Sequence, residues 1–104
     1  MVMSEREVHE LAAELDRWLD GLPRDQLLAS RIEPNPFSPG PGDARLAGFG
    51  VPVWALVGHR VAGKLTIEQV AADYALPLEA TLAAFAYYLR HRAAIDARLE
   101  ANAA

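Results

Sequence analysis

The chain has 104 residues, a formal net charge of −4 and no cysteine, which suits a single domain and excludes a disulfide framework or thiolate chemistry. Hydrophobic residues make up 52% and charged residues 23%, which excludes a wholly disordered chain and favours a soluble, alanine-rich helical fold. The N-terminus MVMSEREVHE has no apolar signal region, and no apolar run is long enough to cross a bilayer. A cytoplasmic location is therefore expected.

The first predicted element is an amphipathic helix. Ser4 followed by Glu7 has capping-box spacing, and apolar residues then recur at steps of three and four. The helix should end near Gly21. Because residues 1–44 carry nine acidic and four basic side chains, residues 1–30 are predicted to form an acidic helical arm. The recurring apolar residues are Val8, Leu11, Leu15, Trp18 and Leu22.

A segment crowded with proline and glycine, RIEPNPFSPGPGD, follows a short second helix predicted from Pro23 to Leu28. Proline lacks the amide donor that helices and strands need, so residues 31–44 are predicted to be an irregular linker. The linker would separate the acidic arm from a core domain at residues 45–104. The acidic residues of the arm form either a solvated face or a surface that meets a basic partner.

The core domain begins with two β-prone pieces, Arg45 to Ala47 and Val51 to Val53, on either side of Gly-Phe-Gly. They predict a short hairpin. The predicted fold class is mainly α: a helix-turn-helix-like three-helix core with this β-hairpin and the N-terminal amphipathic arm. The helices of the core are expected at residues 54–62, 67–74 and about 78–100.

The helices joined across residues 74–77 have the layout of a helix-turn-helix, whose second helix would read base edges in DNA. The positions that would touch bases include Leu78, Glu79 and Leu82, and none is basic. Guanine and adenine edges need Arg, Lys, Asn or Gln. The last helix instead has a second apolar stripe, so it is expected to be sandwiched, with the stripe against the N-terminal helix, a twin subunit or another protein. The stripe consists of Leu78, Leu82, Phe85 and Leu89.

Basic side chains that could contact DNA phosphates are Arg60, Arg90 and Arg92. The alternative is a solvated face with partners one helical turn away, such as Arg92 and Asp96. The histidines lack the spacing of metal ligands, and no serine has a recognisable base nearby. No metal, cofactor or enzymatic activity is therefore predicted.

Residues 45–99 are similar to a bacterial family called domain of unknown function 433. The resemblance rests on a turn glycine before V-P-V-W, a helix that ends in A-G, a capped T-I-E start, D-Y before the turn and paired tyrosines in the last helix. The matching residues are Gly48, Val51, Pro52, Val53, Trp54, Ala62, Gly63, Ile67, Glu68, Asp73, Tyr74, Ala83, Tyr87 and Tyr88.

Members of that family are viewed as antitoxins, encoded beside a PIN-like ribonuclease toxin and built around a helix-turn-helix-like DNA-binding domain. The resemblance implies that this chain neutralises such a toxin and autoregulates its operon. We expect its helix-turn-helix core to be dimeric. The family often has a Thr-Arg pair where this chain has Phe49 and Gly50, and a basic residue where it has Leu82. These differences remove positive charge from the DNA side, which favours protein binding over operator recognition.

In this interpretation the arm lies on the toxin, and its apolar side chains anchor the contact. Two other functions stay open. The chain would be a transcriptional regulator without a toxin, using its arginines on DNA, or a structural homodimer with the apolar stripe as its seam. The predicted anchors are Leu11, Leu15, Trp18 and Leu22.

Overall fold

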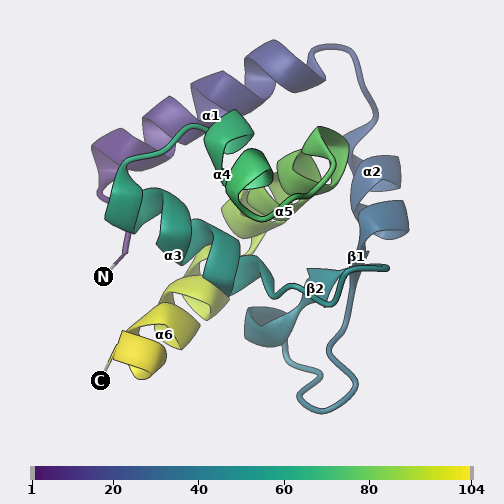
Figure 1. The fold of residues 1–104 in the computed structure, drawn as a ribbon, viewed down its shortest axis with the longest axis vertical. Helices are drawn as coiled ribbons and strands as arrows, with labels where there is room; N and C mark the ends of the chain where they lie inside the picture. Colours follow the sequence, from purple (N-terminus) through teal and green to yellow (C-terminus); the bar gives the residue numbers. More distant parts are fainter. Residues whose placement is uncertain (1, 104) are drawn as a thin grey trace.

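The fold is mainly α, with a small antiparallel sheet (Figure 1). The structure is a computed structural model and describes residues 2–103. The elements are α1 Glu5–Leu19, α2 Arg24–Arg31, β1 Ile32–Glu33, the 3-10 helix η1 Pro41–Asp43, β2 Arg45–Leu46, α3 Val53–Gly63, α4 Ile67–Asp73, α5 Leu78–Arg90 and α6 Arg92–Ala103. Helix α5 contacts all the other α-helices and lies at the centre of the fold. Among the described residues, no helix has the length and apolar character needed to cross a membrane.

Helix α1 begins with the predicted capping box. The Glu7 amide donates to Ser4 Oγ at 3.2 Å, and the Ser4 amide donates to Glu7 Oε1 at 3.0 Å. This second hydrogen bond lowers the pKa of the Glu7 carboxyl. The apolar face of α1 is buried and joins one hydrophobic cluster with residues of α3, α4, α5 and α6. The N-terminal segment therefore belongs to the same packed core as the residues that follow the predicted linker.

The sheet differs from the predicted hairpin in one of its strands. Strand β2 lies where the first β-prone piece was predicted, but it pairs with β1, with Ile32 opposite Leu46. The second piece contributes only a bridge, because Pro52 has no amide hydrogen and Val53 already begins α3. Part of the predicted linker is thus a strand, and the loop between β1 and β2 carries η1.

Helices α3, α4 and α5 form the predicted three-helix core. Helix α4 begins with a second capping box, in which Thr66 Oγ1 accepts from the Gln69 amide at 3.2 Å. Ala75, in the turn between α4 and α5, has φ 53°. This left-handed conformation usually favours glycine and costs an alanine about 1–2 kcal/mol. The turn thus keeps the conformation of a helix-turn-helix without its common glycine.

The predicted long helix at residues 78–100 is wrong, because it is two helices that meet at His91. The His91 backbone has φ −130° and ψ 39°, and its amide donates to the carbonyls of Tyr87 and Tyr88. The imidazole stacks on the Tyr87 ring with centroids 4.2 Å apart. The change of direction brings α6 against α3 and η1, where Ile95 and Leu99 are buried.

Ionisation of Tyr88 is predicted to destabilise the fold at high pH. Burial, together with the hydrogen bond that its hydroxyl donates to Asp96 at 2.9 Å, raises the pKa of Tyr88 to about 12. A pKa above the unfolded value stabilises the fold fully below pH ~10, and this contribution is lost as the pH rises through ~12. We expect tyrosinate absorbance at 295 nm to rise late, together with loss of helical circular dichroism. Ionisation of all three tyrosines near pH ~10 with unchanged helicity would contradict this.

Candidate protein-binding groove

A groove of about 560 Å³ opens where the end of α1, the whole of α2 and the start of α5 meet. Five of its nine lining residues are leucines, and only Glu79 is charged. Such a concave, mostly apolar surface is typical of a binding site. We call it the α1–α2–α5 groove. Its lining residues are Leu19, Leu22, Pro23, Gln26, Leu27, Ser30, Leu78, Glu79 and Leu82.

The groove exists because the chain turns sharply after α1, and the short helix α2 that follows covers only part of α5. Gly21 has φ 75°, a left-handed conformation that reverses the chain, and the Leu22 amide donates to the Leu19 carbonyl at 3.0 Å. Helix α2 packs on α5 but has no fully buried residue. Leu22 is therefore 57% exposed and Leu78 is half-buried, whereas Leu19 and Leu82 are buried at the base of the groove.

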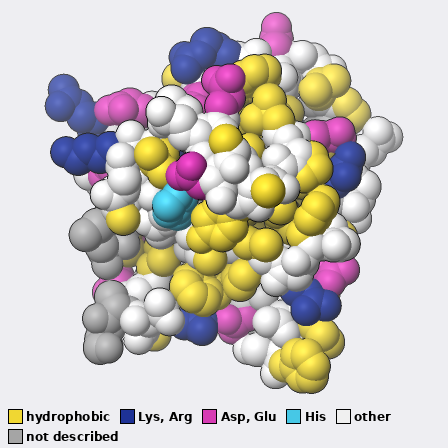
Figure 2. Space-filling view, in the orientation of Figure 1, with side chains coloured by type: hydrophobic (Ala, Val, Ile, Leu, Met, Phe, Trp, Pro, Cys, Tyr) yellow, Lys and Arg dark blue, Asp and Glu magenta, His cyan; other side chains and the backbone are white. Residues whose placement is uncertain are grey.

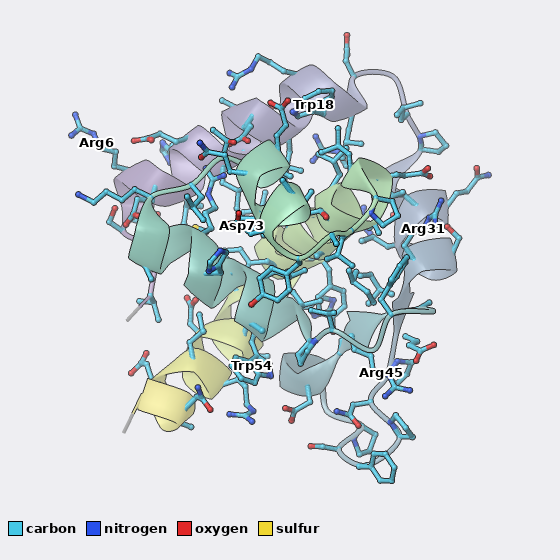
Figure 3. All side chains as sticks on the ribbon, in the orientation of Figure 1. Arg6, Trp18, Arg31, Arg45, Trp54 and Asp73 are labelled. Atoms are coloured by element: carbon cyan, nitrogen blue, oxygen red, sulfur yellow. The ribbon has the colours of Figure 1, made fainter. Side chains whose placement is uncertain are left out.

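The groove joins residues from two separately predicted sets. Leu22 was expected to anchor a partner, whereas Leu78 and Leu82 were expected to form the apolar stripe of the last helix, and all three line the groove. Trp18 lies near the end of α1 and is 40% exposed (Figure 3). Leu89 is half-buried and is not part of the lining. Trp18 is thus an exposed apolar side chain on the helix whose end forms one wall of the groove.

Two predicted anchors, Leu11 and Leu15, and two stripe residues, Leu82 and Phe85, are buried inside the chain. Leu11 and Leu15 are fully buried on the face of α1 that packs toward α5, so the prediction that they contact a partner is wrong. Phe85 is also fully buried, and the guanidinium carbon of Arg60 lies 5.7 Å from its ring centroid. The stripe of α5 is thus largely covered by α1 and α2, which is one of the outcomes expected for a sandwiched helix.

Ion pairs surround the groove and hold its walls together. Arg31 on α2 donates to Glu79 on α5 at 3.0 Å, and Arg24 on α2 donates to Asp16 on α1 at 2.5 Å. These carboxylates are well exposed, so each pair adds at most about 1 kcal/mol to stability. Figure 2 shows hydrophobic side chains next to charged ones where α1 meets α2. These two ion pairs connect α2 to α1 and to α5.

The arginines predicted to contact DNA each pair with a carboxylate of α1 or α2. Arg90 lies 2.6 Å from Asp25, and Arg92 lies 2.9 Å from Glu5, whose pKa it lowers by hydrogen bonding. The alternative partner of Arg92, Asp96, instead accepts the hydrogen bond from the Tyr88 hydroxyl. The acidic N-terminal half thus meets the basic residues of the second half within the fold.

Arg60 is placed differently from the other two, because most of its side chain is covered. Its side chain is 11% exposed, and Nη1 donates to Glu14 Oε1 at 2.8 Å. The second carboxylate oxygen of Glu14, Oε2, accepts from the Ile67 amide at 2.7 Å, at the start of α4. The prediction that Arg60 contacts DNA is therefore wrong, since its guanidinium joins α1 to α3 inside the molecule.

Sequence reasoning missed part of the groove and one exposed aromatic side chain. Leu19 and Leu27 line the groove. Leu19 lies four residues after Leu15 and three before Leu22, so helical spacing could have identified it, whereas the short α2 gives Leu27 no such signal. Phe37 is 92% exposed in the loop between β1 and β2. Its signal was its position among four prolines in the sequence PNPFSPGP.

Among residues 2–103, no group of three or more His, Asp or Glu side chains is placed to hold a metal ion. The groove has a single titratable lining residue, Glu79, which pairs with Arg31. Comparison of the chain with protein-family models, curated proteins and solved structures finds no match.

Proposed function

We propose that this chain is an antitoxin-like protein that binds and neutralises a PIN-like ribonuclease toxin through the α1–α2–α5 groove. The observation that carries the proposal is a leucine-lined groove that includes the exposed Leu22, together with the exposed Trp18 near the end of α1. The resemblance of residues 45–99 to an antitoxin family supplies the class of partner. The geometry supports the general part of the proposal, which is that the chain binds another protein.

The groove suits an apolar helix or loop of the partner. Exposed tryptophan and leucine side chains around a concave surface are typical of interface anchors, which carry most of the binding energy. Glu79, the one charged lining residue, is already paired with Arg31, so it is not an uncompensated charge in the groove. In this mechanism the chain inhibits the ribonuclease by covering its surface rather than by chemistry.

Autoregulation of an operon would need a surface other than the middle of α5. Residues 80–86 of α5 are buried without interruption, and the Glu79 side chain at its start is anionic. A recognition helix needs an open face with donors for base edges. Repression would therefore act through another face of the protein or through its complex with the toxin.

Replacement of both exposed anchors is the direct test. The double variant Trp18→Ser, Leu22→Ser should lose co-purification with the ribonuclease encoded by the adjacent gene and should fail to rescue growth. Loss of two anchors is expected to weaken binding by about 30-fold or more. Phe49→Ser removes a 45% exposed aromatic side chain outside the groove and is the matched control. Equal inhibition by the double variant, with unchanged circular dichroism, would exclude the groove as the toxin site.

A further inference from the structure

A second hollow, of about 380 Å³, lies between the proline-rich loop that joins β1 to β2 and the C-terminal end of α5. We call it the loop pocket. Helix α5 and the residue after it contribute Tyr87, Arg90 and His91 to its lining. Helix α2 contributes Leu28, whereas Leu27 of the same helix lines the α1–α2–α5 groove. The two hollows share no lining residue, so the loop pocket is a separate site.

The wall that the loop provides is held in place by hydrogen bonds. The Tyr87 hydroxyl donates to the Pro41 carbonyl at 2.9 Å, which fastens the loop to α5. The Asp43 amide donates to the Gly40 carbonyl at 3.1 Å, and Arg98 of α6 donates to the Asp43 carboxylate at 2.8 Å. Three of the lining residues are prolines, whose rings fix the backbone angle φ. The pocket is therefore preorganised, which lowers the entropy cost of binding a ligand.

The body of the pocket is apolar. Ala44 is buried, Leu28 and Ile32 are half-buried, and the three proline rings complete this part of the lining. The Tyr87 ring adds a flat face to the same wall. Apolar atoms of a ligand would leave water on entering such a surface, which favours binding. Flat proline and tyrosine rings suit a ligand whose apolar part is itself a planar ring.

Two nitrogen-bearing side chains, Arg90 and His91, also line the pocket. Arg90 lies 2.6 Å from Asp25, but the two side chains are 47% and 85% exposed, so water weakens this ion pair. A guanidinium has five N–H donors and can bind a second anion. The His91 ring stacks on the Tyr87 ring with centroids 4.2 Å apart. Stacking occupies a face of the imidazole and leaves its N–H edge for a ligand.

The charges around the pocket favour an anion. Glu33 is the only acidic side chain among the lining residues, and Arg45 lies 2.7 Å from its carboxylate. The side chains of this pair are 28% and 38% exposed, so it is better shielded from water than the pair of Arg90 with Asp25. The negative charge of Glu33 is thus the more fully compensated of the two. Arg90 is the charge that a ligand would meet.

We propose that the loop pocket binds a small carboxylic acid with a planar apolar ring. The ring lies against the prolines and Leu28, and the carboxylate accepts hydrogen bonds from Arg90, in place of Asp25, and from His91. Arginine can bind a carboxylate through two parallel hydrogen bonds, which is the strong form of this contact. The volume of about 380 Å³ is near the lower end for ligand sites, which favours a small molecule over a segment of another protein.

The compounds 2-naphthoate and 2-naphthamide test this proposal, because they share a planar ring and differ in charge. Titration of the full chain, labelled with nitrogen-15 and followed by NMR, should give 2-naphthoate a dissociation constant on the order of 0.1–1 mM. The amide should bind at least fivefold more weakly. The largest shifts with 2-naphthoate should occur at the amides of Ile32, Gly40 and His91, rather than at Leu22 and Leu78 of the groove.

Two variants of one ion pair separate ligand binding from a structural effect. Arg90→Gln removes the cation, so it should weaken 2-naphthoate binding at least fivefold and leave 2-naphthamide binding unchanged. Asp25→Asn breaks the same ion pair but keeps Arg90, so 2-naphthoate should bind at least as tightly as it does to the wild type. Both side chains are well exposed, and circular dichroism should show the same helicity in the two variants.

Four results would overturn the proposal. They are no saturable binding of 2-naphthoate up to about 5 mM, equal affinity for acid and amide, shifts centred on the groove, or equal loss of binding in Arg90→Gln and Asp25→Asn. The last result would show that the ion pair supports the fold rather than the ligand. Because no ribonuclease is present, these measurements are independent of the proposed function.

Discussion

Glu14→Ala is expected to lower the free energy of unfolding by about 3–5 kcal/mol, because it removes one partner of a buried ion pair. Glu14 is 10% exposed at its side chain and accepts from Arg60 at 2.8 Å and from the Ile67 amide at 2.7 Å. Its loss leaves a guanidinium and an amide without partners in a poorly solvated position. It also releases α1 from α3 and α4 together.

Urea unfolding followed by circular dichroism measures this change. Glu10→Ala is the control, since Glu10 lies on the exposed face of the same helix and should change stability by no more than about 0.5 kcal/mol. Glu14→Gln keeps an oxygen that can accept from the Ile67 amide but loses the negative charge. Its loss of unfolding free energy should therefore lie between those of Glu14→Ala and Glu10→Ala. Similar midpoints for Glu14→Ala and Glu10→Ala would show that the buried pair has little influence on stability.

Leu15→Ala is expected to cost about 2–5 kcal/mol, the range for truncating a buried leucine. Leu15 is fully buried where α1 packs on the rest of the chain. Trp18, three residues later on the same helix, is 40% exposed, so Trp18→Ala should cost no more than about 1 kcal/mol. The pair of variants separates folding from binding along one helix. Equal destabilisation by the two would contradict the division between core and groove.

The burial of apolar residues in the N-terminal segment also limits which variants can test its role in binding. Because Met3, Val8, Leu11, Leu15 and Leu19 all contribute to the core, deletion of residues 1–30 should unfold the chain rather than remove a partner-binding arm. Loss of inhibition by such a deletion would then reflect misfolding. Substitutions at exposed positions of the groove are the informative alternative.

The helical character of the chain could be predicted from its sequence because the signals are local. Ser4 with Glu7 marks the start of α1, and Thr66 marks the start of α4. The spacing of apolar residues also predicts which face of α1 is hydrophobic. It does not divide that face between Leu15, which packs in the core, and Leu22, which stays open, since both lie on the same stripe.

The other differences between the predicted and the observed structure depend on contacts between residues that are far apart in the sequence. Arg60 looks available for DNA until Glu14, 46 residues earlier, is placed beside it. Strand β1 pairs with β2 across a proline-rich stretch, whereas the sequence favours a hairpin between adjacent pieces. The break at His91 has no glycine or proline to mark it, because packing of α6 against α3 and η1 determines the angle.

The buried carboxylate of Glu14 also affects how the chain emerges during translation. Helix α1 leaves the ribosome first, but the groups that complete it, Arg60 and the Ile67 amide, are made 46 and 53 residues later. Domains of this kind fold only when such non-local contacts can form. The leucine face of α1 therefore lacks most of its packing partners until α5 has been synthesised.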